Sequence, residues 1–218
     1  MDPVYKVVDS LDWMTIVLFL SMVVLALGKY LFQNRFLNFI ILPFNNKYVV
    51  LHSKKGRLLN WFHILLTLFQ LVNFSLFLFL AGNTFFELDG NNPLLTFFLV
   101  MGGVVLFQLV KLALQLTKGY VFNTQTLVAE ILFNKTSYLN YSSLVMFIAN
   151  VILVYIANDS KIVFYVAFVL IVFINVIGFV KLLKNYQKAI IPNLFYFILY
   201  LCALEIAPLV IVGTYLKD

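Results

Sequence analysis

The stretch LYLCALEIAP, residues 199–208, places one carboxyl group inside an apolar run that extends over residues 190–216. Glu205 lies twelve residues after Asn193 and twelve residues before Lys217. At about 1.5 Å per residue, a helix would put Glu205 about 18 Å from each polar boundary, near the middle of a hydrocarbon layer about 30 Å thick. This length and composition predict a membrane-spanning helix.

The same apolar character extends over the whole chain. Of its 218 residues, 63% are hydrophobic and 11% are charged, and the mean hydropathy is +1.00. Soluble domains carry about 25% charged residues. We therefore expect an all-α polytopic membrane helix bundle that forms a single domain in the lipid bilayer. The net charge of +6 comes from basic residues clustered in a few loops, which indicates membrane orientation and not nucleic-acid binding.

Six apolar runs predict six transmembrane helices, at residues 13–31, 59–81, 93–116, 142–157, 162–183 and 190–216. The connection at residues 33–59 predicts a short helix that ends before Pro43, followed by an extended segment. Residues 124–133 predict a short amphipathic surface helix. We expect both segments to lie along the cytoplasmic membrane interface. Turns at residues 83–92 and 158–160 and a basic link at residues 184–188 join the other spans.

The distribution of basic residues predicts the orientation of the bundle. All Lys and Arg residues except Lys6, Lys161 and Lys217 lie in or beside the connections after the first, third and fifth spans. Cytoplasmic loops are enriched in these residues, so both termini are expected outside the cytoplasm. Within the first connection, a basic cluster either contacts anionic lipid headgroups or only sets this topology. The cluster consists of Lys54, Lys55 and Arg57.

Glu205 is the first candidate for a functional residue. A charged side chain in mid-membrane is costly and usually faces the bundle interior or a cavity. Pro208 has no N–H to donate to the carbonyl of Leu204, so a helix kink is expected one turn beyond Glu205. In one hypothesis the carboxyl group of Glu205, beside the freed carbonyl, forms a proton or cation site. In the other it stays neutral and hydrogen-bonds amides on neighbouring spans.

Four amide side chains are the second set of candidates. Asn73, Asn150 and Asn175 each lie near the middle of a predicted span, and Gln70 lies one turn from Asn73. Together with Glu205 they either line a polar pathway or act as interhelical hydrogen bonds that hold the bundle together.

Several motifs of enzymes are not found in this sequence. It has no Gly-x-Ser-x-Gly, no His-Glu-x-x-His and no phosphate-binding Gly-rich loop. His52 and His63 come without the Cys or carboxylate neighbours of a metal site. We expect no enzymatic activity, cofactor or metal. The leading hypothesis is a non-enzymatic inner-membrane component that packs with other envelope proteins or with itself. The alternative is a small proton- or ion-coupled transporter or channel that uses Glu205.

Three segments resemble a known family. Residues 42–48 (LPFNNKY), 119–124 (GYVFNT) and 199–209 are similar to an integral membrane protein family of Bacteroidetes described as domain of unknown function 4271. The resemblance extends over nearly the whole chain. It implies an inner-membrane protein of about this size and places Glu205 in the family's last span, and it implies no activity.

Overall fold

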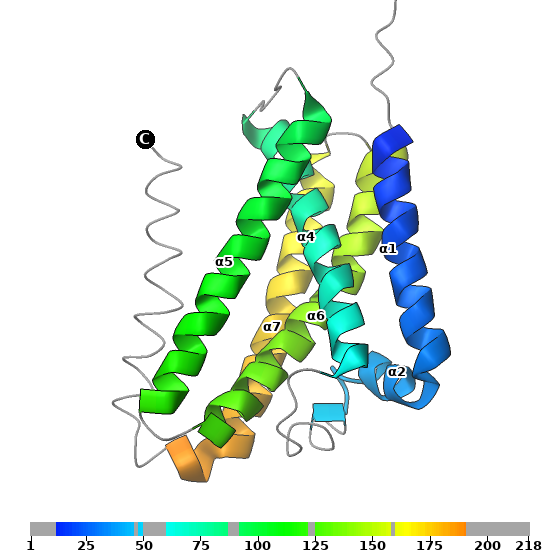
Figure 1. Ribbon diagram of the computed structural model, residues 1–218. Helices are drawn as coiled ribbons and strands as arrows, with labels where there is room; N and C mark the ends of the chain where they lie inside the picture. The colour runs from blue at the N-terminus through cyan, green and yellow to red at the C-terminus, as the bar shows by residue number, and fades with distance from the viewer. Residues whose placement is uncertain are drawn as a thin grey trace, which may run out of the picture.

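The computed structural model describes residues 12–45, 48–49, 60–86, 92–121, 125–157 and 160–190, and all regular structure within them is helical (Figure 1). The helices in chain order are α1 (Asp12–Leu31), α2 (Gln33–Ile40), α4 (Trp61–Phe86), α5 (Pro93–Val121), α6 (Gln125–Tyr155) and α7 (Lys161–Ile190). The predicted all-α class is thus confirmed for this part of the chain.

Five of these helices are long and apolar enough to cross a membrane. The candidate spans are Asp12–Leu31, Trp61–Phe85, Pro93–Thr117, Val128–Tyr155 and Lys161–Lys184. The shortest has 20 residues, which corresponds to about 30 Å of helix, the thickness of the hydrocarbon layer. They overlap the first five predicted spans. The sixth, at residues 190–216, lies outside the described residues except for its first one.

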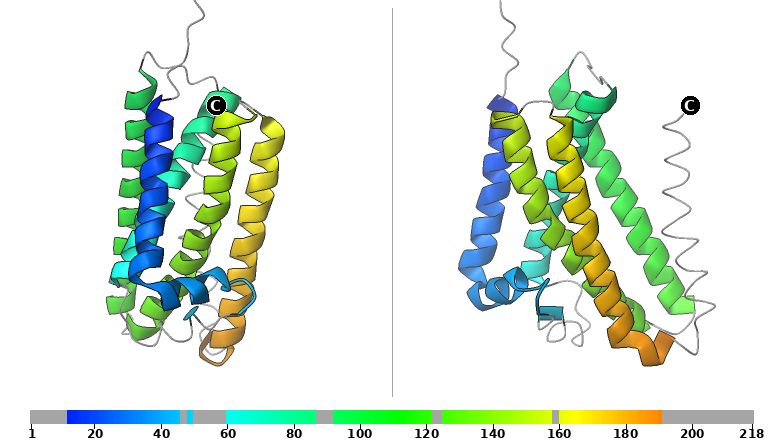
Figure 2. Two further views of the ribbon diagram at one scale, coloured as in Figure 1. Left: turned by 90° about the vertical axis from the view of Figure 1, so that its right-hand side faces the viewer. Right: turned by 180° about the vertical axis from the view of Figure 1, so that it is seen from behind.

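Helices α4 and α6 form the centre of the bundle. They run in the same direction, and α1, α5 and α7 run the opposite way around them (Figures 1 and 2). Buried residues make up 56% of the apolar segment of α6 and 44% of that of α4, but 17% in α1 and α7 and 6% in α5. The outer helices therefore present mostly exposed apolar side chains, as helices in contact with lipid do.

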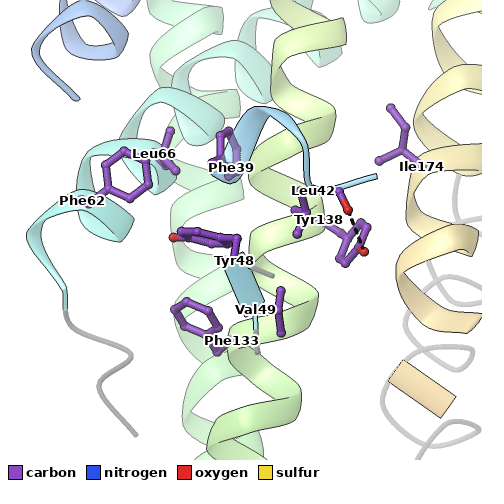
Figure 3. Packing of buried hydrophobic residues seen from close by; sticks show 9 residues of the cluster. All are labelled: Phe39, Leu42, Tyr48, Val49, Phe62, Leu66, Phe133, Tyr138 and Ile174. Carbon is purple, nitrogen blue, oxygen red and sulfur yellow. Dashed lines mark hydrogen bonds between the residues drawn. The ribbon is translucent and has the colours of Figure 1, made fainter. Parts of the chain in front are cut away.

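The connection after α1 folds back against one end of the bundle, which is drawn lowest in Figure 1 and is called the lower end below. Helix α2 ends at Ile40, before Pro43, as predicted. The lower cluster consists of nine buried side chains: Phe39, Leu42, Tyr48, Val49, Phe62, Leu66, Phe133, Tyr138 and Ile174 (Figure 3). Because Phe39 and Leu42 have no exposed surface, the connection closes this end of the bundle and does more than lie along the interface. Tyr48 and Val49 are helical, where an extended segment was predicted.

The predicted surface helix at residues 124–133 and the predicted span at residues 142–157 are wrong as separate elements. Both belong to the continuous helix α6. The intervening sequence NKTSYLNY, residues 134–141, was interpreted as part of the second connection, but half of it is buried. Its hydroxyl groups bond within the helix: Thr136 donates to the carbonyl of Leu132 over 2.9 Å, and Ser137 to that of Phe133 over 2.7 Å. Such bonds satisfy a polar side chain without water.

Two other helices extend beyond their predicted ends. Helix α4 continues to Phe86, so residues 83–86 are helical instead of a turn, and Thr84 donates to the carbonyl of Leu80 over 2.9 Å. Helix α7 continues to Ile190, through the predicted basic link at residues 184–188. In both cases a polar composition marks where an apolar span ends, and the helix itself continues past that point.

Candidate functional site

The predicted amide residues lie in the interior of the bundle. Gln70 and Asn73 are on α4, Asn150 is on α6 and Asn175 is on α7. Asn73 and Asn150 have no exposed surface, Gln70 is 3% exposed and Asn175 is half-buried. The other predicted site residues lie outside the described part of the chain, and these are Glu205, Pro208, Lys54, Lys55 and Arg57.

Asn73 and Asn150 meet between the two central helices. The Nδ2 group of Asn150 donates to the backbone carbonyl of Asn73 over 3.0 Å. The Nδ2 group of Asn73 donates one turn back, to the carbonyl of Phe69, over 2.9 Å. The Oδ1 atoms of both asparagines are buried without a hydrogen-bond partner among the described residues. The two asparagines are therefore joined by a single hydrogen bond, which links α6 to α4.

The other two amides connect different pairs of helices. Gln108 on α5 donates from Nε2 to Oε1 of Gln70 on α4 over 3.4 Å. Asn175 on α7 donates from Nδ2 to Oγ of Ser142 on α6 over 2.9 Å, and also to the carbonyl of Ile171 over 2.8 Å. The predicted amides are thus distributed over the α4–α6, α4–α5 and α6–α7 contacts.

Further buried polar residues, which sequence reasoning missed, extend the contact between the central helices towards the lower end. We define the α4–α6 seam as His63, Thr67, Asn73, Asn140 and Asn150. Asn140 donates from Nδ2 to Oγ1 of Thr67 over 3.3 Å, and Thr67 donates to the carbonyl of His63 over 2.8 Å. Asn134 and Asn140 fell in a predicted surface connection. Ser137 lies three residues from each of them, a step that places consecutive members about 60° apart around a helix, and this was the available signal.

His63 and Asn134 are buried with unsatisfied polar atoms. His63 is 5% exposed, and its ring stacks on that of Phe133 with centroids 4.9 Å apart and an interplanar angle of 27°. Neither ring nitrogen of His63 and neither amide atom of Asn134 has a hydrogen-bond partner within the described residues. Such groups cost free energy, so they need either a packing reason or a functional one.

Charged and phenolic groups fix the connection to the lower end of the bundle. Lys181 on α7 donates from Nζ to the carbonyls of Pro43 and Leu42, over 2.7 and 3.3 Å. Arg35 on α2 donates to Oδ1 of Asn60 over 2.6 Å. Burial raises the pKa of Tyr48 well above its usual value, although the positive charge of Arg35 acts in the opposite direction. Tyr48 is therefore neutral in this cluster.

The described residues contain no group of three or more His, Cys, Asp or Glu side chains that could hold a metal ion. The chemistry of the seam is that of neutral amides, hydroxyl groups and one imidazole. These groups donate and accept hydrogen bonds between helices.

Comparison with known proteins gives one match. A family model described as Domain of unknown function (DUF4271) matches residues 14–216. The three segments on which the sequence resemblance rests all lie within that match. No curated protein and no solved structure matches the chain.

Proposed function

Because the chain belongs to the family described as Domain of unknown function (DUF4271), whose description assigns no activity, we propose a function from the packing of its polar groups. The protein is a non-enzymatic, multi-pass component of a bacterial inner membrane. It packs with other envelope proteins through its apolar outer surface.

The distribution of the amide hydrogen bonds is the observation that carries this proposal. Asn150 on α6 donates to α4, Asn175 on α7 donates to α6, and Gln108 on α5 donates to α4. A transport pathway needs polar groups that face one common route. Hydrogen bonds that hold a bundle together need only a partner helix. Amides spread over three helix pairs support the packing role.

The exposed apolar surface of the outer helices is available to lipid and to membrane partners. Phe19 and Met22 on α1 are exposed, and so are Ile162 and Phe173 on α7. Lipid tails are as apolar as these side chains, so the hydrophobic effect does not favour association of this surface with another protein. Partners are selected instead by shape and by a few polar contacts.

The described basic residues support a six-span topology with both termini outside the cytoplasm. Lys29, Arg35, Lys181 and Lys184 lie towards the lower end, whereas Lys161 begins α7 at the opposite end (Figure 1). By the positive-inside rule the lower end faces the cytoplasm. The sixth span, at residues 190–216, then returns the chain to the outside.

Exposed aromatic rings support the same placement in the membrane. Tyr30 at the end of α1 is 85% exposed, Trp61 at the start of α4 is 75% exposed, and Tyr120 at the end of α5 is 76% exposed. All three positions belong to the lower end. Aromatic rings are enriched at the headgroup level on both sides of a membrane, so these three rings mark the lower end as a membrane interface.

Purification from the native membrane tests the packing role. Tagged protein is extracted in mild detergent, and the mass of the intact complex is measured beside an untagged strain. A stoichiometric membrane-protein partner is expected. A lone monomer that also crosslinks to no neighbour in native membranes contradicts the proposal.

One observation favours the transport alternative. His63 and Asn140 in the seam, and Asn134 on α6, carry buried polar atoms without described partners, and Glu205 would supply a protonatable group to a polar route. Reconstitution into liposomes tests this alternative. It predicts a flux driven by a proton or ion gradient that Glu205→Gln abolishes. Absence of flux in the wild type, or unchanged flux in this variant, removes it.

A further inference from the structure

The outward side of α5 has no partner helix among the described elements. The inward side of α5 carries Phe97, Val104 and Gln115, which are at most 8% exposed. The opposite side forms the outer α5 face, which we define as Leu95, Leu99, Gly102, Gly103, Leu106 and Val110. Of these, Leu99 is 67% exposed, Leu106 is 65% exposed and Val110 is 51% exposed.

Two adjacent glycines lie in the middle of this face. A Cβ atom added at Gly102 or at Gly103 would meet no atom within 4 Å. Glycine is a poor helix former and fills no space against lipid. In membrane helices, small residues are enriched where another helix approaches closely. The glycine pair therefore indicates close approach by a helix that is not among α1 to α7.

The chain itself supplies a segment of suitable length. Helix α7 ends at Ile190, and α5 ends at Val121, at the same lower end of the bundle (Figures 1 and 2). The chain continues for 28 residues beyond Ile190, and residues 190–216 are almost entirely apolar. At about 1.5 Å per residue this run matches the length of α5. Ala203 and Ala207 are four residues apart, which is the small-xxx-small spacing of close helix contacts.

We propose that residues 190–216 form a helix that packs antiparallel on the outer α5 face, with Ala207 against Gly102 and Gly103. This inference rests on the six-span topology proposed above. Counted from the lower end, Ala207 is seventeen residues from Ile190, and Gly103 is eighteen residues from Val121. Ala203, thirteen residues from Ile190, is about 20 Å along its helix, between the levels of Val110 and Leu106.

The packing also orients the carboxyl group of Glu205. On a helix, a residue two positions from Ala203 and two from Ala207 lies on the opposite side of the helix from both. Glu205 thus faces away from α5, on the outer surface of the bundle, where a polar group of another membrane protein can meet it.

Paired cysteines test the packing in a Cys202→Ser background, because Cys202 is the only cysteine in the chain. Each variant also carries Ala203→Cys, which places a thiol on the side of residues 190–216 proposed to face α5. Val110→Cys introduces a thiol on the outer α5 face. Val176→Cys on α7 is the matched control, since both valines are 51% exposed. Leu106→Cys provides a second position on the outer α5 face. Full-length variants in native membranes are oxidised, and the products are separated by mass under denaturing conditions.

We expect an intrachain disulfide in Val110→Cys, at several-fold higher yield than in Val176→Cys. The disulfide should be lost when Ala203→Cys is omitted. Crosslinked dimers in place of the intrachain product would show that a second copy occupies the face, and they overturn the proposal. Equal yields for the two variants, or no product in both Val110→Cys and Leu106→Cys, overturn it as well.

A parallel measurement separates this inference from the topology on which it rests. The side of the membrane that exposes the C-terminus is determined by labelling a C-terminal tag in sealed vesicles. A tag on the same side as the lower end refutes the six-span topology, and the docking proposal with it. A tag on the opposite side without the disulfide refutes the docking alone.

Discussion

Gly178 on α7 lies directly against the aromatic ring of Tyr138 on α6. A Cβ atom at residue 178 would lie 2.7 Å from Cδ2 and 2.8 Å from Cδ1 of that ring. The hydroxyl group of Tyr138 donates to the carbonyl of Leu42 over 3.4 Å (Figure 3). The tyrosine is thus held by α7 on one side and by the connection after α2 on the other. The absence of a side chain at residue 178 sets how closely α6 and α7 pack.

Gly178→Ala should therefore destabilise the bundle. The added methyl group forces the ring of Tyr138 or the α7 backbone to move, and such overpacking costs about 1–3 kcal/mol. The free energy of unfolding is measured by titrating detergent-solubilised protein with a denaturing detergent. Gly28→Ala on α1 is the control, because its added carbon would lie 4.0 Å from Cε2 of Phe62. Equal stability of the two variants would refute the steric explanation.

Lys181→Met should release the connection from α7. The side chain of Lys181 donates to two backbone carbonyls, at Pro43 and Leu42, and hydrogen bonds from a charged donor contribute about 1.5–3 kcal/mol. We expect a loss of stability in this range and faster proteolysis around residues 41–45. Lys184→Met, one turn further along α7 at an exposed position, should change neither. Unchanged proteolysis of Lys181→Met would show that the lower cluster holds the connection without this lysine.

Asn150→Ala should weaken the contact between α6 and α4 by a modest amount. Interhelical hydrogen bonds in membranes contribute about 0.6 kcal/mol on average and about 1.7 kcal/mol at most. The acceptor is the backbone carbonyl of Asn73, which Asn73→Ala leaves in place. A double-mutant cycle of these two variants should therefore give a coupling energy below about 0.5 kcal/mol. A larger coupling energy would mean that the two side chains contact each other directly.

The approximate positions of the five long apolar helices could be predicted because they depend on composition. An apolar run of about 20 residues has few alternatives to crossing a membrane. The extent of α6 could not be predicted in this way. Residues such as Thr136 and Ser137 look solvated in the sequence, but in the structure they bond to carbonyls of their own helix. Whether a polar side chain is satisfied by its own helix or by water depends on the helices packed around it, and composition does not contain that information.

The amide residues of the candidate site illustrate the same limit. Their depth follows from counting residues along each span, and Asn73 and Asn150 are indeed buried. Their partners depend on the direction in which each helix faces. Asn175 is directed to Ser142 on α6, and Gln70 is joined to Gln108 on α5. These choices follow from the order of the helices around α4 and α6, which the apolar runs do not specify.

His63→Phe separates a packing role of the α4–α6 seam from a transport role. The ring of His63 stacks on Phe133, and its two nitrogens have no described hydrogen-bond partner. Phenylalanine keeps the stacked ring and removes two buried polar atoms, so the free energy of unfolding should stay within about 1 kcal/mol of the wild type or increase. Phe133→Ala, which removes the ring on which His63 stacks, should cost about 3–5 kcal/mol.

If the seam conducts protons, His63→Phe will instead abolish a gradient-driven flux in liposomes while the bundle remains folded. If His63→Phe is stable and the complex purified from native membranes keeps its mass, the packing role is supported. A marked loss of stability would show that the imidazole nitrogens of His63 make hydrogen bonds that the bundle needs.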